Sequence, residues 1–165
     1  MSDTTDRLGL ALLAAGQSQK EVTHNEALLQ IDMLVQAVVV NAGLTAPPEA
    51  PGAGQCWIVG RAALGAWQGR DDALAGWTAG GWRFWPPTEG ALVWNSATLR
   101  PLRFTAGRWT DVVDAGALRV GGKQVVGAQQ PAILAPSGGT NPDVQARSAI
   151  SAIIAVLQAH GLVSN

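Results

Sequence analysis

The chain has 165 residues and a mass of 17.1 kDa, which fits one domain or one small domain with helical extensions. Its 47% hydrophobic and 14% charged residues exclude general disorder, and no apolar run approaches the ~20 residues of a membrane-spanning helix. The single cysteine, Cys56, excludes an internal disulfide and is compatible with synthesis in a reducing cytosol. A formal net charge of −1 gives no reason to expect nucleic-acid binding. The amino terminus is acidic with a short apolar stretch, unlike a secretory signal.

Charged residues are distributed unevenly along the chain. Residues 1–56 hold two basic and six acidic side chains, whereas residues 57–123 hold eight basic and five acidic ones. Residues 124–165 hold only Asp143 and Arg147. Because a solvated surface usually carries about 25–35% charged residues, we expect another protein surface to cover this last segment.

A first helix is predicted over about 24–40. Thr23 and Glu26 have the T-x-x-E spacing of a capping box. Apolar residues then recur at three- and four-residue intervals, which predicts one buried helix face made of Leu28, Ile31, Leu34, Val35 and Val38. Asn41-Ala42-Gly43 and Pro47-Pro48 predict the end of the helix. Residues 1–22 are interpreted as an arm.

The middle of the chain, about 54–127, reads as antiparallel β structure, because short apolar runs alternate with turn signals roughly every ten residues. All seven Trp lie here. Gly121-Gly122 is a typical two-residue hairpin turn. The expected strands are Gln55–Val59, Gly65–Trp67, Leu74–Trp77, Gly81–Trp85, Ala91–Trp94, Leu99–Phe104, Arg108–Val113, Leu118–Val120 and Lys123–Val126.

A second helix is predicted near the carboxyl end. Asn141 as N-cap, Pro142 at the first helical position and Asp143 in the first turn form its start signal, and His160-Gly161 its stop. A short apolar seam marks one face, and burial within the subunit or at a symmetry axis would both explain the lack of charge. The residues assigned to an oligomer interface are Ile150, Ile153, Ile154 and Leu157.

No catalytic, cofactor-binding or metal-binding residues are predicted, and the protein is expected not to be an enzyme. The two histidines, His24 and His160, fall at predicted helix ends, and Cys56 lies in an apolar strand. One Cys and two distant His do not make a metal-ligand set. The carboxylates show no spacing that selects a catalytic pair, and no phosphate-binding loop or nucleophile elbow is present.

The tryptophans and arginines of the β region allow two interpretations. Indole faces stack on sugar rings and guanidinium groups bind acidic substituents, which would make a glycan site. Alternatively, a small β domain with few Leu and Ile uses Trp as its core. Period-two alternation in 81–85 separates Trp82 and Phe84 from the opposite face. The residues assigned to glycan or partner contact are Arg83, Trp85, Arg108 and Trp109.

Several segments resemble a domain family of unknown function from prophages and gene transfer agents of alphaproteobacteria. The resemblance lies in LLAAGQSQKEVTHNEALLQIDMLVQAVV (12–39), PPEAPGAGQCWIVG (47–60), GAWQG (65–69) and AGWTAGGWRFWPPTEGALVW (75–94). The tail, 125–162, is similar to the carboxyl ends of tail and spike proteins from the same elements.

This resemblance implies a virion structural protein, made in the bacterial cytoplasm and located on the surface of a phage-like particle. Some relatives run on into fibre domains, and the shorter chain here suggests a head-spike base or adaptor between a capsid vertex and a surface fibre. The implied partners are copies of itself (five at a capsid vertex, three in a tail fibre), a capsid protein and a fibre protein. The alternative is a tail-fibre or receptor-binding module that binds host capsular polysaccharide directly. Neither interpretation predicts nucleic-acid binding or membrane insertion.

The sequence thus predicts an α+β fold in three parts: an arm and helix (1–46), a Trp-rich β module (47–127), and a linker with an oligomerisation helix (128–165). The lead-in to the first helix holds more amides and charges than one local cap requires. We expect some of them to dock the arm on the β module or on a neighbouring subunit: Gln17, Gln19, Lys20, Asn25 and Glu26.

Overall fold

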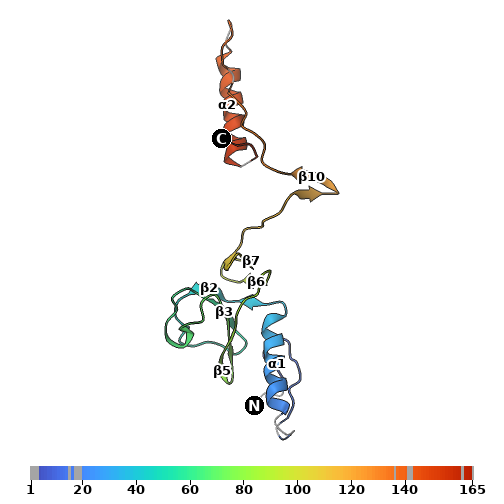
Figure 1. Cartoon of the computed structure of the whole chain (residues 1–165), viewed down its shortest axis with the longest axis vertical. Coiled ribbons are helices and arrows are strands. Elements are labelled where there is room, and N and C mark those ends of the chain that lie inside the picture. Colours follow the sequence, from blue (N-terminus) through green and yellow to red (C-terminus); the bar gives the residue numbers. More distant parts are fainter. Residues whose placement is uncertain are drawn as a thin grey trace. The chain divides into compact units, whose positions relative to one another are not determined.

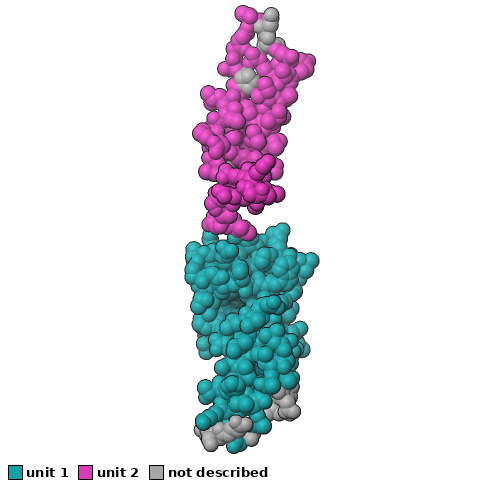
Figure 2. All heavy atoms as spheres, turned by 90° about the vertical axis from the view of Figure 1, so that its right-hand side faces the viewer, with its two compact units in different colours: residues 1–112 teal, residues 113–165 magenta. Residues whose placement is uncertain are grey.

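The computed structural model describes residues 4–14, 16, 20–135, 137–140, 143–160 and 162–164. It confirms the α+β class, with an N-terminal helix, a central set of strands and a C-terminal helix (Figure 1). The chain divides into two compact units, residues 1–112 and 113–165 (Figure 2). The predicted hairpin after Asp114 therefore belongs to the second unit, with the C-terminal helix.

The elements follow the expected strands closely, with two exceptions. The segment Gly65–Trp67 is a 3-10 turn, and two strands precede the first expected one. The elements are α1 (Lys20–Leu34), β1 (Val38–Val39), β2 (Asn41–Leu44), β3 (Cys56–Val59), β4 (Leu74–Thr78), β5 (Gly81–Trp85), β6 (Leu92–Asn95), β7 (Arg100–Thr105), β8 (Arg108–Thr110), β9 (Leu118–Val120), β10 (Lys123–Val126) and α2 (Val144–Ala159).

Two four-stranded sheets form unit 1. One has the order β2-β3-β4-β5 and the other β1-β6-β7-β8. The hairpin-linked pairs are antiparallel, as predicted, but β2 runs parallel to β3 and β1 runs parallel to β6. Because β1 and β2 follow each other directly, this short segment joins the two sheets.

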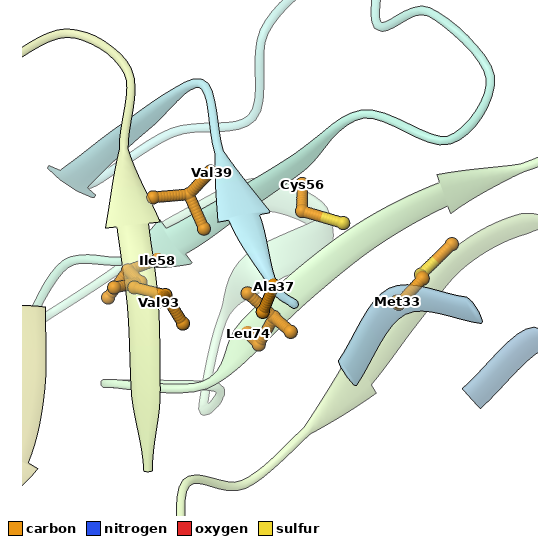
Figure 3. Packing of buried hydrophobic residues seen from close by; sticks show 7 residues of the cluster. All are labelled: Met33, Ala37, Val39, Cys56, Ile58, Leu74 and Val93. Carbon is orange, nitrogen blue, oxygen red and sulfur yellow. The ribbon is translucent and has the colours of Figure 1, made fainter. Parts of the chain in front are cut away.

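The first core of unit 1 gathers side chains from α1 and both sheets: Met33, Ala37, Val39, Cys56, Ile58, Leu74 and Val93 (Figure 3). Helix α1 lies close to β4 because Gly76 has no side chain. A Cβ at this position would lie 1.9 Å from the Met33 sulfur. The buried Met33 thioether thus occupies the space that any other residue at 76 would fill, which fixes the helix on the sheet.

The second core lies on the other face of the β2-β3-β4-β5 sheet and is built from tryptophan. Trp57 and the fully buried Trp67 form its centre with small residues. Trp82 contacts the Trp67 ring edge-to-face, with centroids 5.2 Å apart, and Phe84 packs beside them. The alternation in β5 thus directs Trp82 and Phe84 into this core.

The structure corrects the predicted first helix. Helix α1 ends at Leu34 rather than near 40, and Thr23 and Glu26 lie inside it rather than in a capping box. Gln36 adopts a left-handed conformation with φ of 48°, and the following valines form β1, as β-branched residues favour. The predicted helix face is consequently not buried: of its five residues, Leu28 is half-buried and the rest are exposed, namely Ile31, Leu34, Val35 and Val38.

A buried carboxylate on α1 holds the N-terminal arm in place. Asp32 is 1% exposed and accepts hydrogen bonds from Thr5 Oγ1 (2.7 Å), Arg7 N (3.1 Å) and Leu8 N (2.6 Å). The Arg7 guanidinium donates in turn to carbonyls at the end of α1, including Gln36 O at 2.9 Å and Asp32 O. A cation on these carbonyls is a favourable helix C-cap. A residue of the arm, far from Leu34 in the sequence, therefore caps the carboxyl end of α1.

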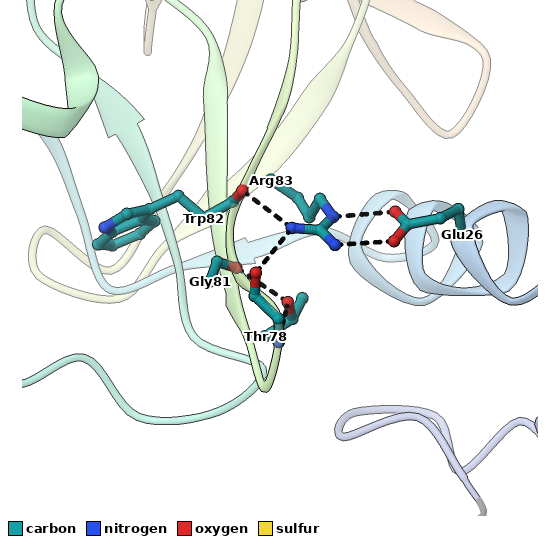
Figure 4. Close-up of polar contacts among 6 residues, drawn as sticks. Glu26, Thr78, Gly81, Trp82 and Arg83 are labelled. Atoms are coloured by element: carbon teal, nitrogen blue, oxygen red, sulfur yellow. Dashed lines mark hydrogen bonds and ion pairs between the residues drawn. The ribbon is translucent and has the colours of Figure 1, made fainter. Parts of the chain in front are cut away.

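An ion pair joins the other side of α1 to β5. Arg83 Nη2 lies 2.7 Å from Glu26 Oε1, and Arg83 Nε lies 2.9 Å from Glu26 Oε2 (Figure 4). This two-bond geometry is the strong arrangement for Arg and a carboxylate. It holds the pKa of the Glu26 carboxyl below its ordinary value. Arg83 is therefore engaged by α1, and the pair orients the helix on the sheet edge.

Unit 2 consists of the β9-β10 hairpin, an extended segment and α2. Gly121 and Gly122 have φ of 55° and 79°, as a tight hairpin turn requires. Asp143 is the N-cap of α2, because its side chain accepts from Ala146 N at 2.9 Å. The predicted cap Asn141 and Pro142 lie outside the described residues. His160 is the C-cap.

We predict that Asp32→Ala lowers the free energy of unfolding by about 3 kcal/mol or more, since each buried donor left without an acceptor costs about 1–3 kcal/mol. Urea denaturation measures the change. Asp6→Ala, which removes an exposed carboxylate from the same arm, is the control and should change the free energy by less than about 0.5 kcal/mol. Equal, small effects of both variants would show that Asp32 does not organise the arm.

The Glu26–Arg83 pair predicts a pH-dependent contribution to stability. The pKa of the Glu26 carboxyl in the folded protein lies below its ordinary value of 4.5. The pair therefore stabilises the fold above pH 4.5, and this stabilisation is lost as the pH falls through the folded-state pKa. Glu26→Gln should cost about 0.5–1 kcal/mol at pH 7, because the pair is partly exposed. The difference from wild type should shrink in urea titrations as the pH falls below 4.5 and through the folded-state pKa of Glu26. Glu49→Gln is the control, and a pH-independent difference for Glu26→Gln would contradict the assignment.

Candidate functional site

Strand β5 places the first two predicted contact residues against α1. Arg83 is bound to Glu26, as described above, and also donates to Gly80 O at 3.1 Å. Trp85 is half-buried and packs against the first core. It also lines a largely apolar cavity of about 470 Å³ together with Trp109 and the Pro86-Pro87 turn. The structure thus brings Trp85 and Trp109 to one cavity, whereas Arg83 shares a smaller cavity beside α1 with Trp85 but not with Trp109.

Strand β8 places the other two residues at a second and more polar cleft. We name this the inter-sheet cleft, because its walls come from β2 and β3 on one side and from β6, β7 and β8 on the other. Its volume is about 550 Å³. Trp109 belongs to its wall, where the indole Nε1 donates to Asp72 O at 2.8 Å and the ring meets Phe104 edge-to-face. Arg108 also lines the cleft.

Four charged side chains line the inter-sheet cleft, and both carboxylates are already paired. Arg61 Nε lies 3.1 Å from Asp72 Oδ2. Asp111 Oδ2 lies 2.8 Å from Arg100, whose hydrogen bond lowers the pKa of the Asp111 carboxyl. Among the described residues, none forms an ion pair or hydrogen bond with the Arg108 side chain. One positive charge of the cleft is therefore available to a ligand.

Asn95 is a cleft residue that sequence reasoning missed. It is 3% exposed, and its Oδ1 accepts from Ala97 N at 3.0 Å. Within the described part of the chain, no residue accepts a hydrogen bond from its Nδ2, and this atom is not one of the fully buried polar atoms without a partner, so it reaches solvent. The sequence Trp94-Asn95-Ser96 resembles an ordinary strand end followed by a turn. Only the pairing of β6 between β1 and β7 shows that the Asn95 side chain is turned inward.

The predicted oligomer residues on α2 divide between two environments. Ile154 is buried and Leu157 is half-buried within unit 2 itself. Ile150 and Ile153 are exposed, Ile153 by 59%. Val156, which sequence reasoning did not select, is exposed beside them. The free apolar face of α2 is therefore made of Ile150, Ile153 and Val156.

The predicted docking residues of the lead-in also lie in different places. Asn25 holds the arm, because its Oδ1 accepts from Leu13 N at 2.9 Å and its Nδ2 donates to Leu13 O at 3.0 Å. Glu26 contacts β5 through Arg83. Lys20 is exposed at the start of α1. Gln17 and Gln19 lie outside the described residues.

The described residues contain no metal-ligand cluster, and their single cysteine is a protonated, buried thiol. Cys56 is buried, and burial raises the pKa of its thiol to about 11, so the thiol stays protonated at neutral pH. No cluster of three or more His, Cys, Asp or Glu is present among those residues. Neither described helix has the length and hydropathy needed to cross a bilayer.

Comparison with known proteins identifies the fold unit that carries the inter-sheet cleft. Residues 24–110 match the model of a family described as "Protein of unknown function (DUF2793)". This segment includes most of α1 and all eight strands of unit 1. Among curated proteins, none matches the chain. Since the matched segment exceeds half of the 165 residues, the protein belongs to the DUF2793 family.

Proposed function

We propose that the protein is a non-enzymatic, homo-oligomeric structural component of a phage-like particle such as a gene transfer agent. In this role it forms a spike base or adaptor that connects a capsid vertex to a surface fibre. The observation that carries the proposal is the apolar surface of unit 2. The particle context comes from the sequence resemblance described above.

Unit 2 leaves most of its apolar side chains in contact with solvent. In its described part, only Ile154 and Val163 are buried hydrophobic residues. Leu134 is 88% exposed. The further exposed ones are Val113, Leu118, Val120, Val125, Val126, Ile133, Val144, Ile150, Ile153, Val156 and Leu162. Scattered apolar residues are normal on a surface, but a set of this size marks an interaction site.

The hairpin of unit 2 leads to the same conclusion. All residues of β9 and β10 are exposed, and an isolated two-stranded hairpin is at best marginally stable in water. The register places Leu118 opposite Val126 and Val120 opposite Lys123, so one face of the hairpin is apolar apart from a lysine next to the turn. Association of several copies would bury this face and the free face of α2 around a common axis. Five copies would fit a capsid vertex, and three would fit a tail fibre.

A second candidate function is a tail-fibre or receptor-binding module that binds host surface polysaccharide directly. The inter-sheet cleft favours it, because an indole, an available guanidinium and an amide NH2 group without an acceptor among the described residues line one site. The two functions are independent, since the cleft belongs to unit 1 and the free apolar faces belong to unit 2.

For assembly, we predict that Ile153→Asp dissociates the oligomer, because a charge on the free face of α2 opposes its burial between subunits. Ser148→Asp, on the opposite face of the helix, is the matched control and should leave the mass unchanged. Light scattering coupled to size-exclusion chromatography measures the mass. A folded Ile153→Asp protein with the wild-type mass would contradict the assignment of this face.

For the particle role, we predict that deletion of this protein removes one surface feature from purified particles. Electron microscopy of particles made with and without it should show intact heads and tails that lack the spike and its fibre. Complementation with the wild-type chain should restore the spike, and complementation with the Ile153→Asp variant should not. Particles of unchanged architecture after deletion would overturn the proposed function.

A further inference from the structure

The inter-sheet cleft has the dimensions and shape of a ligand site. Its volume of about 550 Å³ falls within the range of about 300–1,000 Å³ typical of small-molecule sites. Its walls belong to two different sheets, and the short β1–β2 segment joins these sheets on one side. Strands of both sheets thus form the walls of the cleft, and Arg61, Asp72, Thr98 and Asp111 come from the turns and loops between them.

The polar groups of the cleft are arranged for a ligand with several hydroxyl groups. The Asn95 Nδ2 is a donor that no described residue uses, on a side chain only 3% exposed. Thr98 adds a hydroxyl group, and the paired carboxylates of Asp72 and Asp111 provide acceptors at the rim. A sugar hydroxyl can donate and accept at once, so it matches this mixture of donors and acceptors.

Trp109 is the aromatic residue among the apolar residues that line the cleft, which also include Ile58 and Leu102. The hydrogen bond from its Nε1 to Asp72 O and the contact with Phe104 fix the orientation of the indole. A fixed aromatic side chain with a polar surround suits a ring that has both apolar CH groups and hydroxyls. This favours a saccharide over a purely apolar ligand.

The charges of the cleft select one acidic group on the ligand. Arg61 and Arg108 balance Asp72 and Asp111 in formal charge, and only Arg108 has no partner among the described residues. A single carboxylate would form a two-bond pair with this guanidinium. A doubly charged phosphate group would find only one available cation, because Arg61 is already paired with Asp72, which disfavours nucleotides and phosphorylated ligands.

We propose that the inter-sheet cleft binds a saccharide unit that bears one carboxylate, with Arg108 pairing the carboxylate, Asn95 Nδ2 donating to a hydroxyl or ring oxygen, and Trp109 contacting the sugar ring. This rests on the second function proposed above and is independent of assembly through unit 2. Of the four residues predicted to contact a glycan or partner, only Arg108 and Trp109 belong to this site, and Arg83 and Trp85 do not.

Titration of the full chain with trigalacturonic acid and with neutral cellotriose, followed by calorimetry, tests the proposal. The acidic trisaccharide should bind at least tenfold more tightly than the neutral one. Arg108→Gln should abolish this preference, and Asn95→Asp, which keeps the acceptor for Ala97 N but replaces the free donor, should weaken binding at least tenfold. Arg103→Gln is the matched control, since Arg103 is an exposed arginine on β7 of the same sheet that does not line the cleft.

Circular dichroism and light scattering on the same samples separate the possible failures. A folded wild-type protein that binds neither trisaccharide at millimolar concentration would overturn the saccharide site. Binding that persists in both cleft variants, or that falls equally in Arg103→Gln, would also overturn it. If Asn95→Asp does not fold, the Arg108→Gln result decides alone. The mass of the wild-type sample reports on assembly separately, so loss of one proposal leaves the other intact.

Discussion

The structure of unit 1 depends most on the buried carboxylate of Asp32. It collects three donors from the arm, and the arm in turn supplies Arg7 to the carbonyls at the end of α1. Helix α1 therefore stops where the arm caps it, and the chain can turn at Gln36 into β1 and β2. Because β1 and β2 join different sheets, the position of this turn determines how the two sheets meet and where the inter-sheet cleft forms.

The two units differ in how many of their apolar side chains they bury in a core. Unit 1 has two cores, one between α1 and both sheets and one built from tryptophan, although the apolar residues Ile31, Leu34 and Val35 near the end of α1 stay exposed. Unit 2 has a hairpin and a helix with scarcely any core, and residues 124–165 carry only two charges. In the proposed assembly, a segment with so little charge and so little internal burial would gain stability from contacts with other copies of the chain. Recognition and assembly can thus reside in separate parts of one small protein.

Much of the fold could be predicted from the sequence, because each strand of the β region has its own turn signals and alternation. The predicted first helix is too long. The spacing of Ile31, Leu34 and Val38 imitates a helix face, whereas the helix ends at Leu34, where the side chain of the distant Arg7 binds carbonyls at its end. Asp32 was missed because an acid on a helix usually faces water. The cleft could not be predicted either, since its residues come from strands distant in sequence and Asn95 looks like a turn residue.

We propose that the chain assembles as a homo-oligomer held through unit 2. The most direct test is the mass of the purified full chain, measured by native mass spectrometry and by sedimentation velocity over a hundredfold dilution. The account predicts one species at a fixed multiple of 17.1 kDa, with a symmetry-compatible number of copies. A folded, stable monomer of 17.1 kDa at all concentrations would contradict it.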